Sequence, residues 1–307
     1  FFCSTMTAPG IFEQVHYLMS IDEALVAFYT NPDEMHELID YITEYELKLA
    51  EQLVKHAHPD ALFHHDDWGS RTSSFLSPEM FEEFYVEPYK QVYGYYKSHG
   101  VQFVFHHADS FCANLVDDMI EMGIDVWQGC MQSNNVPELT KKYKGKITFM
   151  GDIDNKSMDF SGWTNEDCRK AAVRAMEENG MYSFIPCITQ GGPGSVFPGT
   201  YMGLSQAIDE YNFEKFGWTP NAITIFGIFL GIGAGLLIYP TDLLLNIMGV
   251  GLLVMADVCD SADGQLARMT KQYSRIGRIL DGVSSDIWFI SIYVCIALRY
   301  APEWGWK

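Results

Sequence analysis

Apolar and polar positions follow two different patterns along the chain. In residues 1–217, helical segments alternate with short apolar runs, and each run ends in a polar or sulfur-bearing cluster. The five runs occupy residues 61–63, 101–105, 125–127, 146–150 and 182–185. Short buried strands that alternate with helices are typical of parallel βαβ units. Because the carboxyl ends of such strands carry the chemistry, the five clusters together predict a site.

The helical segments between these runs carry start signals. Asn31-Pro32, followed by two acidic residues, predicts a long amphipathic helix over residues 32–56. Ser77-Pro78 opens a second helix, which is rich in aromatic residues. Thr164 and Asp167 are three residues apart and predict a capping box at the start of a third.

From residue 218 onward the pattern changes to long apolar runs. Residues 222–239 are 18 positions without a charge, which is close to the length of a bilayer span. Two further apolar runs follow at residues 243–256 and 287–298. Gly227, Gly231 and Gly235 recur every four residues, so a second helix can pack closely there. The pattern predicts about three transmembrane helices in residues 218–307.

Nearly all of the net negative charge lies in residues 1–217. Of the formal charge of −20, residues 1–217 hold 14 Lys and Arg against 33 Asp and Glu, or −19, and the remainder holds 6 against 7, or −1. An acidic surface argues against nucleic-acid binding. The seven cysteines are scattered and have no CxxC spacing, which favours a reducing cytoplasm over a disulfide framework.

Basic residues between the second and third apolar runs predict the orientation in the membrane. They are Arg268, Lys271, Arg275 and Arg278. By the positive-inside rule this loop is cytoplasmic. Residues 1–217 precede it by two spans, so we expect them on the cytoplasmic side of a multi-pass protein of the inner or cell membrane.

Acidic residues lie where the second and third membrane helices meet this loop. Asp260 and Asp263 are three residues apart and share one face of a helix. Carboxylates at membrane depth are costly unless they face a cation, one another or water. Carboxylate oxygens suit Mg²⁺ or Mn²⁺. The spacing therefore predicts a site for one of these ions.

At these residues the chain resembles the CDP-alcohol phosphatidyltransferases, whose signature is D-x2-D-G-x2-A-R-x8-G-x3-D-x3-D. The match runs without a gap from Asp260 to Asp281. The resemblance implies that Asp260, Asp263 and Asp281 hold two divalent ions, Mg²⁺ or Mn²⁺, on the diphosphate of a CDP-linked lipid. It also implies a nucleotide site made of Gly264, Ala267, Arg268 and Gly277.

The last aspartate of the signature is displaced in this chain. Ser285 stands four residues after Asp281, and Asp286 is one step further, roughly 100° around a helix. In the family this aspartate is the proposed base for the alcohol acceptor, so Asp286 is the candidate here. The implied activity transfers a phosphatidyl-type group to an alcohol and releases CMP, as in phospholipid biosynthesis. The family's domain is longer, so we expect residues 218–307 to be its N-terminal part.

Residues 1–217 resemble a second family. The stretches MTAPGIFEQVHYLMS, HHDDWGS, SPEMFEEF, HGVQFVFHHADS, EMGIDVWQG, KITFMGDID and FPGTYMGLSQAID are similar to the uroporphyrinogen decarboxylase family, which also includes cobalamin-dependent and coenzyme M methyltransferases. The resemblance covers Met6 to Asn212 and implies an α/β fold, a (β/α)8 TIM-type barrel. That barrel is longer, so we expect residues 1–217 to be its C-terminal part, truncated at the N-terminus.

Two reactions are open for the barrel. Methyltransferase members bind zinc through His-x-Cys and a later Cys; His106 and Cys187 match, whereas Ala108 stands in place of the middle Cys. His107 or Asp109 would complete a Zn²⁺ site. Decarboxylase members carry a His after the last strand, where this chain reads CITQGGPGS. In either case a small molecule is the expected substrate.

Asp66 and Asp67 follow the first run and form a candidate acid/base pair, with Asp67 and His106 as the candidate catalytic residues of the barrel. The chain as a whole is thus predicted to be an enzyme that joins a decarboxylase- or methyltransferase-like barrel to a phosphatidyltransferase. The alternative is that the barrel alone is active and the membrane part is inactive or a gene-model artefact. A second copy of the chain is a candidate partner, as a homodimer.

Overall fold

The protein is described by a computed structural model that covers residues 3–191, 194–216, 220–270 and 275–301. The chain divides into two compact units, Phe1–Ala207 and Ile208–Lys307. The first is an α/β unit and the second is entirely helical, which confirms the predicted fold class.

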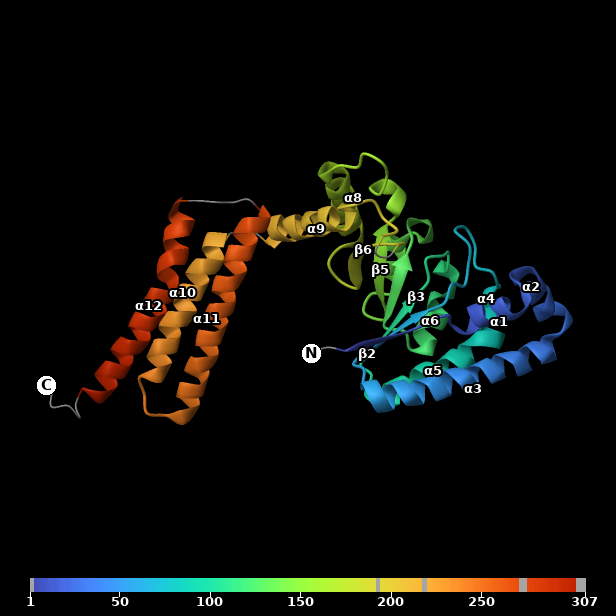
Figure 1. Ribbon diagram of the computed structural model, residues 1–307, viewed down its shortest axis with the longest axis horizontal. Coiled ribbons are helices and arrows are strands. Elements are labelled where there is room, and N and C mark those ends of the chain that lie inside the picture. The colour runs from blue at the N-terminus through green and yellow to red at the C-terminus, as the bar shows by residue number, and fades with distance from the viewer. Residues whose placement is uncertain (1–2, 192–193, 217–219, 271–274, 302–307) are drawn as a thin grey trace. The chain divides into compact units, whose positions relative to one another are not determined.

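Within the described residues, six parallel strands form one sheet in which sequence order and spatial order coincide (Figure 1). They are β1 (Ser4–Thr7), β2 (Ala61–His65), β3 (Phe103–His107), β4 (Val126–Cys130), β5 (Thr148–Ile153) and β6 (Phe184–Ile188). Since all six strands are parallel, their carboxyl ends meet at one edge. The five predicted runs correspond to β2 to β6, whereas β1, which is short and polar in sequence, was not part of the prediction.

Helices connect the strands. In the first unit they are α1 (Ile11–Met19), α2 (Ile21–Thr30), α3 (Pro32–Ala57), α4 (Pro78–Phe81), α5 (Glu87–Ser98), α6 (Val116–Met122), α7 (Val136–Lys142), α8 (Asn165–Asn179) and α9 (Thr200–Phe216). A π-helical turn, Glu82–Val86, joins α4 to α5. The helix α9 crosses the boundary between the two units.

The predicted caps are present at two of three starts. The Ser77 hydroxyl accepts a hydrogen bond from the Met80 amide at the start of α4. Thr164 and Asp167 form the predicted capping box of α8. Asn31 precedes α3 as predicted, but its side chain does not bond the helix amides and instead accepts from the Thr30 hydroxyl at 2.8 Å.

Strands β2 and β3 use their two faces differently. His64 and His106 are fully buried, and both contact Tyr93 of α5. Their neighbours His65 and His107 are partly exposed and stack on each other, with ring centroids 4.6 Å apart. Since strand side chains alternate in direction, each histidine doublet places one ring against the helices, where Tyr93 of α5 lies, and one on the opposite face.

Within the described residues, the second unit contains the end of α9 together with α10 (Pro220–Ile238), α11 (Leu243–Thr270) and α12 (Arg275–Tyr300). Among the described residues, three segments are long and apolar enough to cross a membrane: Asn221–Ile238, Leu243–Gly264 and Gly282–Tyr300. The glycines of α10 lie against the other two helices. A Cβ atom at Gly231 would overlap the Trp288 ring, and one at Gly235 would overlap the Ser291 hydroxyl. The predicted close packing is therefore confirmed.

Candidate functional site

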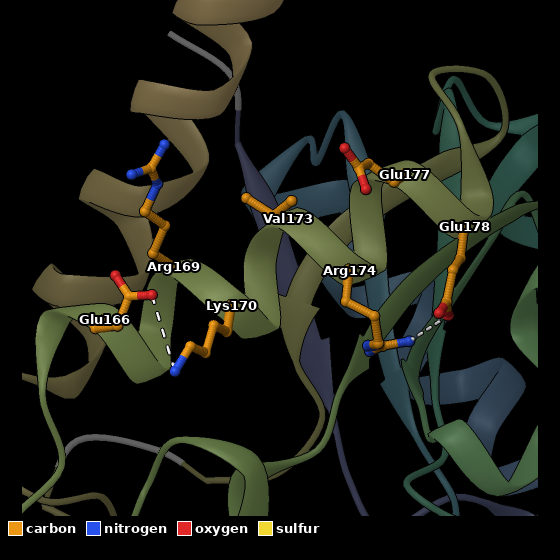
Figure 2. A pocket seen from close by; sticks show the side chains of 7 residues that line it. All are labelled: Glu166, Arg169, Lys170, Val173, Arg174, Glu177 and Glu178. Atoms are coloured by element: carbon orange, nitrogen blue, oxygen red, sulfur yellow. Dashed lines mark hydrogen bonds and ion pairs between the residues drawn. The ribbon is translucent and has the colours of Figure 1, made fainter.

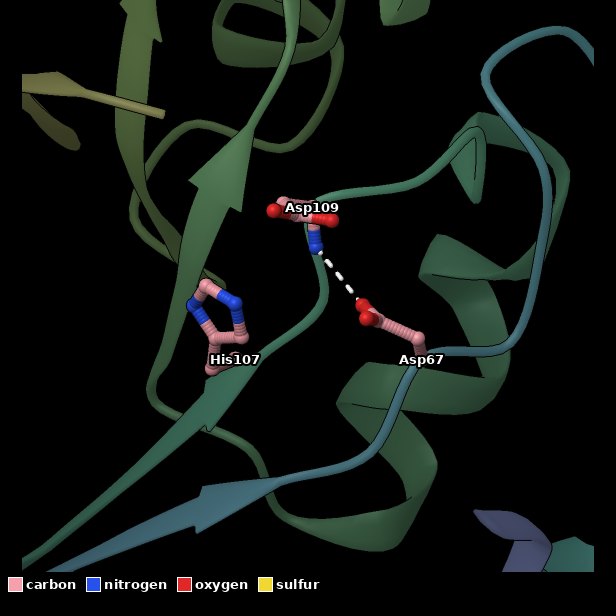
Figure 3. A group of neighbouring side chains, drawn as sticks. All are labelled: Asp67, His107 and Asp109. Carbon is pink, nitrogen blue, oxygen red and sulfur yellow. Dashed lines mark hydrogen bonds between the residues drawn. The ribbon is translucent and has the colours of Figure 1, made fainter. Parts of the chain in front are cut away.

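Three chemically active side chains converge at the carboxyl ends of β2 and β3. Asp67, His107 and Asp109 each offer one ligand atom, and these atoms lie within 4.8 Å of one another. Figure 3 shows the imidazole of His107 facing the two aspartates. All three residues are partly buried. The group has the ligand types and spacing of a metal site.

The backbone explains why these three residues meet. His65 of β2 pairs with His107 of β3, so Asp67 and Asp109 each follow that pair by two residues and lie on the same side of the sheet. The Asp109 amide donates to Asp67 Oδ1 at 2.9 Å, which joins the two loops (Figure 3). The Asp66 amide donates to the His107 carbonyl at 3.1 Å and continues the ladder.

Burial adjusts the protonation of the group. It raises the pKa of Asp67, and it raises the pKa of Asp109 to about 6. It lowers the pKa of His107, with the positive charge on His65 acting in the same direction. Each shift favours the neutral form because the charged form loses hydration. A cation between these groups would favour the ionised carboxylates and the neutral imidazole.

A pair of charged side chains, His65 and Glu13, lies beside the cluster of Asp67, His107 and Asp109. His65 Nδ1 and Glu13 Oε2 of α1 are 3.0 Å apart, and the Tyr17 hydroxyl donates to Glu13 Oε1 at 3.3 Å. The Glu13 carboxylate raises the pKa of His65 to about 9, so His65 is a cation at neutral pH. No sequence signal predicts this pair, because Glu13 lies 52 residues before His65 and outside the five predicted clusters.

Asp66 occupies a different place from Asp67. Its carboxylate is fully buried and accepts hydrogen bonds from the Phe12 and Glu13 amides at the start of α1, both at 2.8 Å, and from the Tyr89 hydroxyl. A Cβ atom at Gly10 would lie 2.5 Å from Asp66 Cβ, so only glycine permits this approach. Burial raises the pKa of Asp66 to about 6. Asp66 anchors α1, and only Asp67 of the predicted pair faces the group.

His106 and Cys187 are not brought together. His106 Nδ1 lies 3.0 Å from the Tyr93 hydroxyl, its Nε2 lies 3.1 Å from the Asp66 carbonyl, and its ring stacks on Trp68 at 3.8 Å. These contacts occupy both ring nitrogens on the helix side of the sheet. Because side chains alternate along a strand, the residue on the site side is His107. Cys187 of β6 instead lies close to the Gln128 side chain of β4, which counteracts the rise in the thiol pKa that burial causes.

In the second unit, two predicted metal ligands lie where the helices meet. The Ser284 hydroxyl of α12 donates to Asp260 Oδ1 at 2.6 Å. The Thr224 hydroxyl of α10 donates to Asp263 Oδ2. Asp263 is only 2% exposed although it lies inside the apolar segment Leu243–Gly264. The two carboxylates of α11 thus face neighbouring helices, one turn apart.

The other predicted residues of this unit are placed only in part. Gly264 follows Asp263 on α11. Outside the described residues lie the side chains of Ala267, Arg268 and Asp281. For Gly277, only its place in α12 is described. Asp286 is exposed on α12, which is a regular α-helix from Arg275 to Tyr300. No bulge in the described part of α12 turns Asp286 toward the position of Ser285.

An open depression of about 440 Å³ lies along α8, away from the strand ends (Figure 2). It is lined by residues that alternate in charge, among them Lys170 and Glu166, whose charged groups are 3.9 Å apart. Arg174 contacts Glu178 and also reaches the buried Asp152 at 2.9 Å, which gives it a structural role. None of the predicted site residues lines this depression.

Comparisons with known proteins agree with these two units. Residues 4–188 match the family model described as uroporphyrinogen decarboxylase, and residues 218–306 match that of CDP-alcohol phosphatidyltransferase. Among solved structures, a methyltransferase from Methanosarcina mazei is similar, with a TM-score of 0.55 and 15% sequence identity. The similarity covers 68% of this chain and 58% of that one, so the chain spans less than two thirds of the methyltransferase's length. No curated protein matches the chain.

Proposed function

The chain belongs to the uroporphyrinogen decarboxylase family through residues 4–188, and we propose that the unit that follows transfers a phosphatidyl-type group from a CDP-linked lipid to an alcohol. The observation that carries this proposal is the placement of Asp260 and Asp263. Two carboxylates, one turn apart inside an apolar segment, are each held by a hydroxyl from a different helix. Carboxylates at membrane depth are retained mainly for function.

The donor set fits Mg²⁺ or Mn²⁺, because both ions prefer carboxylate oxygen and both carboxylates are already oriented. In the sequence, Asp281 comes three residues before Ser284, which contacts Asp260. Bound divalent ions would stabilise the negative charge that develops on the diphosphate. Asp260, Asp263 and Asp281 would hold them, and Gly264, Ala267, Arg268 and Gly277 would border the nucleotide.

In the proposed reaction the alcohol oxygen forms a bond to the lipid phosphorus, the bond from that phosphorus to CMP breaks, and a base takes the alcohol proton. Asp286 is the candidate base because it is the only acidic residue between positions 282 and 300 in the sequence. Its exposed position, one residue beyond the family's aspartate, predicts slower proton removal than in members with the regular spacing.

The test is CMP release from a CDP-lipid by the full chain in detergent with Mg²⁺ or Mn²⁺. Asp263→Asn should reduce the rate by 100-fold or more, since it removes a charged ligand. Asp257→Asn is the matched control, because Asp257 lies on the same helix and is exposed; it should retain the rate. An Asp263→Asn variant as active as the control would refute the transferase assignment.

We further propose that the second unit is a multi-pass membrane domain and that the barrel lies on the side of its basic loop, in the cytoplasm. The three apolar segments support the spans. Protease digestion of sealed inverted vesicles should remove residues 1–217, whereas right-side-out vesicles should protect them.

A specific observation favours a second activity, in the barrel. Asp67, His107 and Asp109 supply three ligands from the ends of neighbouring strands, and catalytic zinc sites typically have three protein ligands and one open position. The donor set of two carboxylates and one imidazole fits Zn²⁺, which would act as a Lewis acid when bound. We propose that the barrel acts on a small molecule by carboxyl-group or one-carbon chemistry, with Asp67 as ligand or base.

Zinc analysis of the purified full chain tests this second activity. His107→Ala should lose zinc, and Asp67→Asn should weaken its binding. His106→Gln is the matched control, since His106 faces the helices. Zinc that depended on His106 and not on His107 would contradict the proposed ligand set.

A further inference from the structure

Gln128 lies next to the cluster formed by Asp67, His107 and Asp109. It pairs in register with His107 on the neighbouring strand, and its side-chain oxygen Oε1 contacts His107 Nδ1. The Gln128 side chain also lies close to the Cys187 thiol of β6, where it counteracts the rise in the thiol pKa that burial causes. Gln128 therefore connects three strands at the floor of the site.

The local backbone aims this side chain. The pairing of β4 with β5 shifts register between Gln128 and Cys130, and Gly129 between them has a φ of +90°. A Cβ atom at Gly129 would lie 3.0 Å from the Ala108 carbonyl, so the bulge needs glycine. The Ala108 amide donates to the Gln128 carbonyl at 3.0 Å, and Trp127 Nε1 donates to the Ala108 carbonyl at 2.9 Å. The loop that carries Asp109 is fixed to the residue that contacts His107.

The chemistry of the two groups determines which of them donates the hydrogen bond between His107 and Gln128. An amide oxygen only accepts, so His107 Nδ1 must donate to Gln128 Oε1. In a neutral imidazole the other nitrogen then carries the lone pair. That nitrogen, Nε2, is on the side of the ring that faces Asp67 and Asp109 in Figure 3. The amide N–H groups of Gln128 remain for the Cys187 thiol, which orients the amide.

We propose that Gln128 is the positioning residue of the barrel site, which fixes the tautomer of His107 so that Nε2 can bind a cation. Cys187 orients Gln128 and is not itself a ligand. The inference rests on the metal centre proposed for the barrel, and it assigns the site a ligand set of two oxygens and one nitrogen. Partners of this kind behind a ligating histidine raise its basicity and hold its ring in place.

The first experiment needs no metal. Histidine ¹⁵N spectra of the metal-free full chain in detergent report which nitrogen of His107 carries the proton, with His107→Gln to assign the signal. The wild type should show the Nδ1–H form. Gln128→Met, which keeps the length but has no acceptor oxygen, should shift His107 toward the Nε2–H form, and Gln128→Glu should retain Nδ1–H. An unchanged tautomer in Gln128→Met would overturn the inference.

The second experiment measures Zn²⁺ affinity by competition with a chelator. Gln128→Met should weaken binding 10- to 100-fold, as is typical for the loss of such a partner. Gln128→Glu should bind at least as tightly as the wild type. Gln102→Met, an exposed glutamine just before β3, is the control and should not change the affinity. Cys187→Ala should bind zinc within a few-fold of the wild type; complete loss would make Cys187 a ligand and overturn the inference.

The two experiments distinguish an error in the proposed metal centre from an error in the role of Gln128. If the wild type binds no zinc through His107, the proposed metal centre is wrong, whereas the ¹⁵N spectra still decide whether Gln128 sets the tautomer. If zinc binds through His107 but Gln128→Met binds it equally well, the metal centre stands and the role of Gln128 is refuted.

Discussion

The pair formed by His65 and Glu13 shows how one contact defines a charge at the site. Glu13 raises the pKa of His65 to about 9, although partial burial opposes this shift. His65 stacks on His107, whose pKa is lowered. The two adjacent rings therefore hold different charges at neutral pH, one cationic and one neutral. A substrate at this edge meets a fixed positive charge beside a coordinating nitrogen.

Removing the carboxylate should remove that charge. In Glu13→Gln the pKa of His65 should fall toward the ordinary value of about 6.5. Since the folded-state pKa is raised, the pair stabilises the fold fully below about pH 6.5, and this stabilisation is lost as the pH rises through about 9. An NMR titration of the imidazole measures the pKa directly. The variant's stability should be less sensitive to pH between 6.5 and 9, and an unchanged His65 pKa would contradict the assigned pair.

His106 should matter for stability. His106→Ala removes a fully buried ring and leaves the Tyr93 hydroxyl and the Asp66 carbonyl without this partner. The expected loss is about 3 kcal/mol, from an unsatisfied polar group and a cavity. Thermal unfolding followed by near-ultraviolet circular dichroism measures it. His107→Ala, at a partly exposed position, is the comparison and should cost much less; equal losses would contradict the assignment of the two faces.

Sequence patterns predicted the strands β2 to β6 and the capping box of α8, because both depend on local rules. They did not predict which histidine of a doublet faces the site. In Phe105-His106-His107 either histidine is compatible with a strand, and only the pairing with β2 and the packing of Tyr93 decide between them. The role of Gln128 depends on a bulge in β4, which leaves no local periodic signal.

The contact between α10 and α12 depends on the absence of a side chain. At Gly231 a Cβ atom would overlap the Trp288 ring. Gly231→Leu should therefore separate the two helices and lower the thermal stability of the second unit in detergent. Gly251→Leu on α11 is the matched control, because nothing lies within 4 Å of a Cβ atom at that position. Equal stability of the two variants would show that this packing is not needed.

The chain carries two candidate metal sites of different composition in two compact units. One offers Asp260 and Asp263, and the other Asp67, His107 and Asp109. Oxygen donors alone favour Mg²⁺ or Mn²⁺, whereas an added imidazole favours Zn²⁺. Since the two sites share no residue, their occupancies should be independent.

This independence can be measured with two variants of the full chain. Asp263→Asn should abolish Mn²⁺ binding at the membrane site and leave the zinc content unchanged. His107→Ala should do the reverse. Electron paramagnetic resonance measures the bound Mn²⁺. If either variant lost both metals, the two proposed sites would not be separate.

In each of the two histidine doublets, His64-His65 and His106-His107, one imidazole is buried and the other is accessible to solvent. His64 and His106 have no exposed surface, whereas His65 and His107 are in part accessible. An acylating reagent such as diethyl pyrocarbonate should thus label one member of each doublet and spare the other for as long as the protein remains folded. The adjacent residue serves as an internal reference, so peptide mass mapping would give a direct record of when the sheet opens.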